Sequence, residues 1–225
     1  MPASVAGTHA SRVDHPGRFG LQNRRKAIFL GVGALALAAT LLTSVSATRA
    51  TAGVSGTSHD LSGKGWGSDQ ICIFCHTPHN AGTAAPLWNH TLTTATFTVY
   101  SSQTMNAAPG QPDGYSKLCL SCHDGTVAID SYGTHAGSNN MTGGEALGTN
   151  LTNDHPISFT YDAALATADG GLVTPASTSQ VVPGVPLFGG KMQCSSCHNA
   201  HDNTKGDFLR LSNSGSALCL KCHVK

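Results

Sequence analysis

Large apolar side chains and charged side chains are both scarce in this chain. Aromatic residues make up 6% of its 225 residues and charged residues 11%, whereas glycine alone accounts for 26 positions. Such a composition gives a folded chain little apolar surface to bury, so an ordinary globular enzyme is disfavoured. The core needs material other than amino-acid side chains.

The few charges are unevenly distributed. The first 52 residues carry six basic residues against one acid, Asp14, whereas the part from Gly53 onward carries seven basic and eleven acidic residues. The acidic part has no basic stripe that would neutralise phosphates. We therefore expect no nucleic-acid partner.

Residues 1–52 are typical of an N-terminal extension with a cleaved export signal. Arg24-Arg25-Lys26 precedes an uncharged apolar run from Ala27 to Leu42, and Ala50-Thr51-Ala52 has the small-residue pattern of a cleavage site before Gly53. The alternative is an uncleaved membrane anchor, but the run is shorter than the roughly 20 residues that span a bilayer. The sequence thus predicts an exported protein.

All eight cysteines lie after residue 52, in four Cys-x-x-Cys pairs that are each followed at once by histidine. The cysteines are Cys72 and Cys75, Cys119 and Cys122, Cys194 and Cys197, and Cys219 and Cys222; the histidines are His76, His123, His198 and His223. This is the haem-attachment pattern: two thiols one turn apart bond one haem, and the adjacent imidazole is its proximal iron ligand. Disulfides and zinc knuckles do not require these histidines, so we predict four covalent haem c groups.

The motifs form a doubled unit. Cys72–His79 and Cys194–His201 share the pattern Cys-x-x-Cys-His-x-x-His, and residues 118–123 and 218–223 share Leu-Cys-Leu-x-Cys-His. We predict one tetrahaem domain over 53–225, with dihaem units at about 71–123 and 193–223 and a loop-rich insertion at 124–192. The expected fold is a small multihaem cytochrome, mostly loop around four haems. Short helices are expected at the motifs, the last capped by Ser216, with short strands within 96–100 and 157–161.

Six further histidines in residues 53–225 are candidates for the distal axial ligands. His79 cannot bind the iron that His76 binds, because residues three apart cannot reach opposite faces of one ring. It must serve another haem, and His201 repeats this arrangement in the second unit.

The remaining candidates differ in their local context. Pro156 holds the backbone of His155 extended, and the acid after His59 can orient its ring. We predict four distal ligands: His59, His79, His155 and His201. His90 is the next candidate, and His135, in a glycine-rich loop, is expected to be a surface residue.

The motifs give the chain a family resemblance. It resembles the multihaem c-type cytochromes with doubled haem motifs, and within them the outer-surface tetrahaem cytochromes that polymerise into extracellular filaments. The residues that carry the resemblance are 58–61, 72–80, 86–89, 118–127, 154–159, 194–201 and 218–223. The resemblance implies haems stacked in an unbroken line, with a histidine of one subunit ligating a haem of the next.

These observations predict an exported tetrahaem electron-transfer protein, with no enzymatic activity of its own. The expected partners are copies of itself in a head-to-tail filament, joined through His79 or else His59, and other redox proteins or extracellular electron acceptors. The expected location is extracellular or the cell surface, with the periplasm as the alternative. A soluble periplasmic shuttle, an oxyanion reductase with an open iron position, and a small subunit of a membrane oxidoreductase remain as alternative functions.

Overall fold

The computed structural model describes residues 53–82 and 87–224, so the predicted export signal lies outside the described residues. Thr51–Lys225 forms one unit. Within the described ranges, every helix is too short or too polar to span a bilayer.

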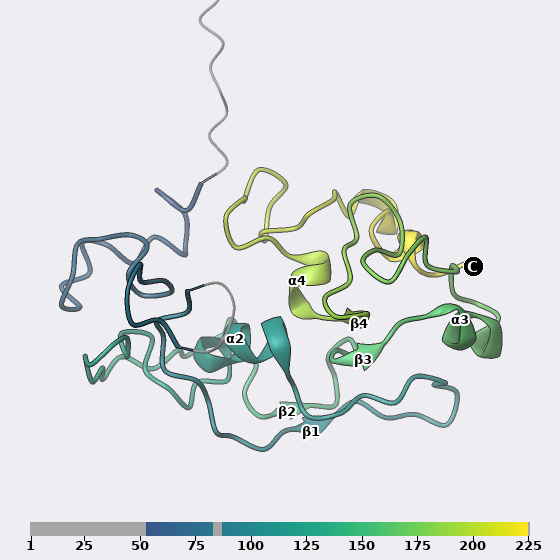
Figure 1. Ribbon diagram of the computed structural model, residues 1–225, viewed down its shortest axis with the longest axis horizontal. Helices are drawn as coiled ribbons and strands as arrows, with labels where there is room; N and C mark the ends of the chain where they lie inside the picture. The colour runs from purple at the N-terminus through teal and green to yellow at the C-terminus, as the bar shows by residue number, and fades with distance from the viewer. Residues whose placement is uncertain (1–52, 83–86, 225) are drawn as a thin grey trace, which may run out of the picture. The chain divides into compact units, whose positions relative to one another are not determined.

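Most of this part of the chain is loop, as the sequence predicts (Figure 1). The α-helices are α2 (Gly114–His123), α3 (Ala163–Asp169) and α4 (Cys194–Cys197), and two 3-10 helices follow, η1 (Ser214–Ser216) and η2 (Cys219–Lys221). The strands are β1 (Thr98–Val99), β2 (Asn150–Leu151), β3 (Phe159–Thr160) and β4 (Lys191–Met192).

The strands form two separate pairs. β1 pairs in parallel with β2, and β3 pairs antiparallel with β4. β1 and β3 lie within the two predicted strand segments, although each contains only two residues. Their partners were not predicted, because no alternating pattern marks β2 or β4. The β3–β4 pair matters for the site, since β4 ends just before the third haem motif.

Each haem motif forms one helical turn, as predicted. The second motif lies at the end of α2, the third contains α4 and the fourth contains η2. The first has no assigned helix, but its His76 N–H donates to the Cys72 carbonyl at 2.7 Å. His198 and His223 make the matching bonds to Cys194 and Cys219, both at 3.0 Å. This i to i−4 bond places both cysteines and the histidine of a motif on one turn.

The predicted cap at Ser216 is wrong. Ser216 is the last residue of η1, and its backbone is left-handed, with φ at 63°. A capping residue needs an extended backbone, so Ser216 cannot serve. Asn213, which precedes η1, makes no side-chain capping bond either, although its side-chain oxygen accepts a bond from the Leu218 N–H at 3.3 Å.

The apolar residues gather in two small clusters that both contact haem motifs. The larger consists of Phe159, Tyr161, Val181, Val185, Leu187, Met192 and Leu218. Cys197 and Cys222 pack against it. The smaller consists of Phe97, Leu120 and Leu151, of which Leu120 lies within the second motif. The protein's own core is therefore built against the haem-attachment turns.

A buried carboxylate organises the loop that follows the second motif. Asp130 is only 3% exposed, and its carboxylate accepts bonds from the N–H groups of Ser138 and Asn139 at 3.0 and 2.9 Å. The Asn139 side chain donates a further bond at 2.7 Å. Gly137 passes so close that an added Cβ would lie 2.2 Å from an Asp130 oxygen, which explains the glycine.

Replacing Asp130 with asparagine is expected to destabilise the protein by roughly 3 kcal/mol at neutral pH, because a bond to a charged group contributes about 1.5–3 kcal/mol. Burial alone would raise the pKa of Asp130, but the bonds from Asn139 and Ser138 hold it below its ordinary value of 3.8. A lowered folded-state pKa gives stability that is present above pH 3.8 and is lost as the pH falls through the folded pKa.

The measurement is denaturant unfolding of the wild type and of Asp130→Asn at pH 7 and near pH 3. The stability difference should shrink at the acid pH. Asp69→Asn is the control, because Asp69 is exposed and distant from this loop in sequence. An equal difference at both pH values would contradict a role for the ionised carboxylate.

Candidate haem-binding site

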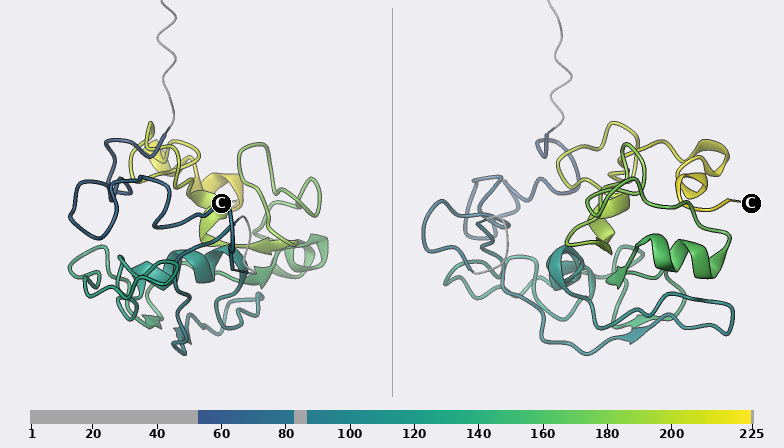
Figure 2. Two further views of the ribbon diagram at one scale, coloured as in Figure 1. Left: turned by 60° about the vertical axis from the view of Figure 1, so that its left-hand side comes forward. Right: turned by 45° about the vertical axis from the view of Figure 1, so that its right-hand side comes forward.

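Two buried side chains clamp the second motif against the third. The Gln193 side-chain oxygen accepts a bond from the Ser116 N–H at 3.0 Å, and its amide donates to Asp113 at 2.8 Å. The Ser116 hydroxyl in turn accepts a bond from the Cys194 N–H at 3.0 Å. Lys191 pairs with the same Asp113. These bonds hold α2 and α4 side by side (Figures 1 and 2).

The sequence reasoning did not identify this clamp. Ser116 stands three residues before Cys119, and Ser216 holds the same place in the second copy. The sequence predicts a role only for Ser216, as a helix cap. Gln193 lies directly before Cys194 but belongs to no repeated pattern, so no local signal could have identified it.

The sulfurs of the first three motifs lie near one another. Burial is the main cause that raises the pKa of Cys75 to about 11, and the neighbouring Cys72 adds to it. Burial is also the main cause that raises the pKa of Cys122 to about 12, and here Cys75 adds to it. A hydrogen bond with Cys194, together with burial, raises the pKa of Cys119 well above its ordinary value. The first motif is therefore adjacent to the second, and the second to the third.

The third and fourth motifs are neighbours as well. Burial is the main cause that raises the pKa of Cys197, and the nearby thiols of Cys194 and Cys219 add to it. Burial, then Cys197, raises the pKa of Cys222 to about 11. No disulfide links any two of the eight cysteines. Cys197 and Cys222 also pack against the same apolar cluster, so the third and fourth attachment turns are neighbours in space.

Backbone carbonyls orient several of the histidines. The Nδ1 atoms of His123, His198 and His155 donate to the carbonyls of Glu145, Asp207 and Pro156 at 2.9, 2.8 and 2.8 Å. A hydrogen bond at Nδ1 fixes the tautomer and leaves Nε2 free to bind a metal ion. These three rings are therefore arranged as iron ligands commonly are.

Three motif histidines each face one histidine from elsewhere in the chain. The ring centroids are 6.0 Å apart for His76 and His201, 6.2 Å for His123 and His59, and 6.4 Å for His223 and His155. These pairs use three of the four predicted proximal ligands and three of the four predicted distal ligands. Each histidine occurs in only one pair.

The remaining proximal and distal candidates are not brought together. His198 and His79 are both exposed. Among residues 53–82 and 87–224, neither ring has another histidine ring against it as the three pairs do. Exposure does not set His198 and His79 apart, because the paired His155 and His201 are exposed as well. What distinguishes them is that neither has a facing histidine ring among the described residues.

His90 and His135 are placed differently from the other candidates. His90 is 4% exposed, and its two ring nitrogens lie 2.7 and 3.1 Å from the carbonyls of Thr91 and Ala128. His135 is exposed, as expected, and stacks on Tyr132 with its Nδ1 donating to a backbone carbonyl at 2.7 Å. The Nε2 of His90 also lies 3.3 Å from the Sγ of Cys122, so this ring is beside the second motif. Neither His90 nor His135 faces a motif histidine as the three pairs do.

Buried polar atoms without a partner lie at the motifs. In the described part of the chain, these atoms are His59 Nδ1, Trp88 Nε1, Asp124 Oδ2 and Ser195 Oγ. Ser195 is inside the third motif and Asp124 follows His123. The Trp88 ring lies 6.0 Å from His76. The propionates of haem accept hydrogen bonds, so the unpaired donors Trp88 Nε1, Ser195 Oγ and His59 Nδ1 fit this group, whereas the Asp124 oxygen does not.

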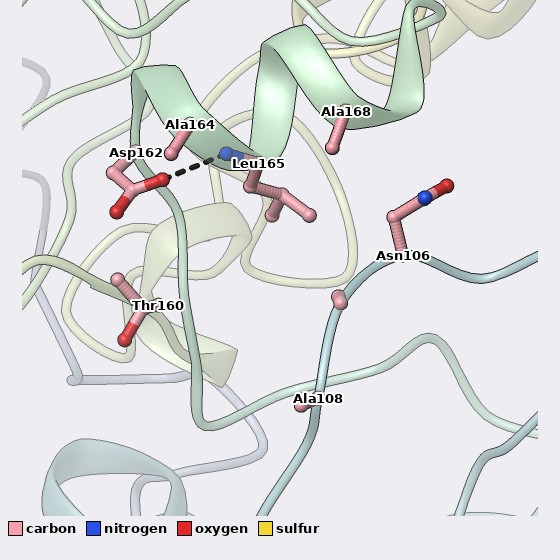
Figure 3. A pocket seen from close by; sticks show the side chains of 8 residues that line it. Asn106, Ala108, Thr160, Asp162, Ala164, Leu165 and Ala168 are labelled. Carbon is pink, nitrogen blue, oxygen red and sulfur yellow. Dashed lines mark hydrogen bonds between the residues drawn. The ribbon is translucent and has the colours of Figure 1, made fainter.

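One hollow of the surface lies away from the motifs. It has a volume of about 370 Å³ and is lined by segment 106–108, Thr160 and α3 (Figure 3). Asp162 caps α3 there by accepting a bond from the Leu165 N–H at 2.8 Å. No cysteine or histidine lines this hollow, so it is separate from the haem-attachment turns.

One comparison identifies the class of the motifs. Residues 186–225, which hold the third and fourth motifs, match the family model of the doubled CXXCH motif. No curated protein matches the chain. The doubled motif indicates covalently bound haem c. Together with the mostly loop fold, it supports a multihaem c-type cytochrome in electron transfer.

Proposed function

We propose that this chain is an exported tetrahaem c-type cytochrome that carries single electrons along its haems and forms the repeating subunit of an extracellular filament. One observation supports this most: the attachment turns are packed close together. The second and third lie on α2 and α4, which Gln193 and Ser116 join, and Cys197 of the third and Cys222 of the fourth pack against the same apolar cluster. Cofactors attached to neighbouring turns are close neighbours themselves.

Haem bound at these motifs supplies one-electron iron chemistry. The chain's contribution is to hold the attachment turns rigidly and to orient the axial ligands. The clamp of Gln193 and Ser116 does the first. The carbonyls that accept from His123, His155 and His198 do the second. In this function no side chain needs to act as an acid, a base or a nucleophile.

Among the described residues, two predicted iron ligands that lack a facing histidine ring support assembly into a filament. His198 lies exposed with its Nδ1 fixed on the Asp207 carbonyl, and the exposed His79 is a second imidazole without a described partner ring. His59 is the other candidate for crossing the interface, but the centroid of its ring lies 6.2 Å from that of His123 in its own chain. In the proposed filament, His79 of one copy ligates the haem held at His198 of the next. Such a head-to-tail contact does not close and therefore makes a fibre.

The same observation favours one alternative function. If no second copy supplies a ligand, the haem at His198 keeps an open position, which is what an oxyanion reductase requires. The two functions differ in the spin state of one iron: a sixth ligand from histidine gives low-spin iron, and an open position gives high-spin iron.

The test is a mass and spin measurement on the secreted material. We expect a mass equal to the chain from about residue 53 plus four haems, and Cys219→Ala/Cys222→Ala should lose one haem. Electron paramagnetic resonance of intact ferric filaments should show only low-spin haem, and dissociated subunits should show about one high-spin haem in four. Fewer than four haems would contradict the tetrahaem proposal. A high-spin signal in the intact material that shifts on adding nitrite or sulfite would favour the reductase.

A further inference from the structure

We infer that His201, His59 and His155 are the second axial ligands of the haems held at His76, His123 and His223. This assignment rests on the proposed function, because it requires haem at each motif. It goes beyond that function by stating which segment completes which cofactor, and it joins the two dihaem units that the sequence suggests.

The distances between the rings carry the assignment. A bond between a metal ion and an imidazole nitrogen is about 2 Å long and the ring centre lies about 1 Å further on, so two imidazoles on one iron have centres about 6 Å apart. The three observed separations are 6.0, 6.2 and 6.4 Å. Interplanar angles of 19°, 87° and 77° are all compatible, because each ring can rotate about its own bond to the iron.

The backbone around His201 holds it in place. The His198 N–H donates to the Cys194 carbonyl at 3.0 Å, which fixes the start of this loop on α4. The Asn199 N–H donates to the Phe208 carbonyl at 2.7 Å, and the Asn199 side chain accepts from the His201 N–H at 3.2 Å. His201 is thus positioned by the third motif while its ring faces His76 of the first.

His59 and His155 are held by different means. The ring of His59 packs on Phe208, with centroids 4.2 Å apart, so the segment before the first motif is fixed against the loop of the third. The Nδ1 of His155 donates to the carbonyl of Pro156 at 2.8 Å, which directs its other nitrogen away from its own backbone. His155 belongs to the insertion, which therefore supplies a ligand and is not merely a spacer.

The assignment changes how the repeat is understood. The haem attached at Cys72 and Cys75, in the first unit, is completed by His201 of the second. The haem of the fourth motif is completed from the insertion. Each of these three cofactors therefore bonds two segments that are far apart in the sequence, and the two dihaem units interlock into a single folding unit.

The first test replaces the three distal histidines one at a time in the full haem-loaded chain. The variants are His201→Ala, His59→Ala and His155→Ala. Compared with the wild type, each should have one more of its four haems in the high-spin state, as measured by electron paramagnetic resonance of the ferric protein. Added imidazole should restore the low-spin signal. The matched control is His135→Ala, which should leave the spectrum unchanged. A purely structural role for these histidines would predict no recovery with imidazole.

The second test decides which haem each histidine serves. Cys72→Ala/Cys75→Ala removes the haem of the first motif. In that background, His201→Ala should add no high-spin signal, because its iron is gone, whereas His155→Ala should still convert one haem. A high-spin signal from His201→Ala in this background would overturn the pairing of His201 with His76.

A density map of the haem-loaded wild type is the measurement that does not depend on these variants folding. It should show iron bonded to both rings of each of the three pairs. A low-spin tetrahaem protein with other pairs would overturn this inference and leave the proposed function intact. A chain without covalent haem would overturn the proposed function.

Discussion

Replacing His79 with alanine is expected to abolish filaments while leaving a folded, secreted subunit that carries four haems. His79 is exposed, and no described ring lies against it, so its loss removes few contacts within the subunit. In the proposed filament it completes the haem at His198 of the next copy. The expected result is soluble monomer in which about one haem in four is high-spin.

Electron microscopy of the extracellular fraction, with the molar mass in solution, measures this effect. The control variant is His135→Ala, which removes another exposed histidine and should leave the filaments unchanged. Added imidazole should return the high-spin haem of His79→Ala to low spin without restoring the polymer. Intact filaments from His79→Ala would contradict the role of this residue.

Replacing Gln193 with alanine is expected to cost roughly 3 kcal/mol of unfolding free energy, since it leaves the Ser116 N–H buried without a partner and removes a bond to a carboxylate. Gln193 is 2% exposed and Ser116 is fully buried. Because domains of this size are stable by only about 5–15 kcal/mol, the loss is a large fraction of the total.

Denaturant unfolding of the haem-loaded protein, followed by its Soret absorption, measures this loss. Gln103→Ala is the matched control, because Gln103 is exposed and makes no side-chain hydrogen bond among the described residues. Its effect should stay within about 0.5 kcal/mol. A second readout is the reduction potentials, which should change for the haems of the second and third motifs, since these lie on the two helices that Gln193 joins. Equal stabilities of the two variants would contradict the clamp.

The features that the sequence predicted correctly are local. A Cys-x-x-Cys-His run becomes one helical turn because the histidine N–H bonds to the carbonyl four residues earlier, as in His76 and Cys72. Alternation in Thr96–Tyr100 indicated a strand, and β1 lies there. The cap at Ser216 failed although it is local, because the chain turns left-handed at that residue, which the pattern of residue types does not reveal.

The features that the sequence could not predict depend on distant segments. β4 is a strand only because β3 runs beside it. Gln193 became important only when folding brought it to Ser116, a residue 77 positions away. His90 stays a candidate ligand, and its contacts with the carbonyls of Thr91 and Ala128 and with the Cys122 sulfur come from segments that its local sequence does not reveal.

The sequence by itself determined the chemistry of this protein, which is covalent haem attachment. The spacing of each motif lets one turn supply both thioether bonds and one iron ligand. A chain poor in large side chains needs such cofactors for a core. The tertiary structure alone decided which histidines face each other, because those pairs join residues as far apart as His76 and His201. Local spacing gives the proximal ligand, whereas the distal ligand depends on how the loops fold over the motifs.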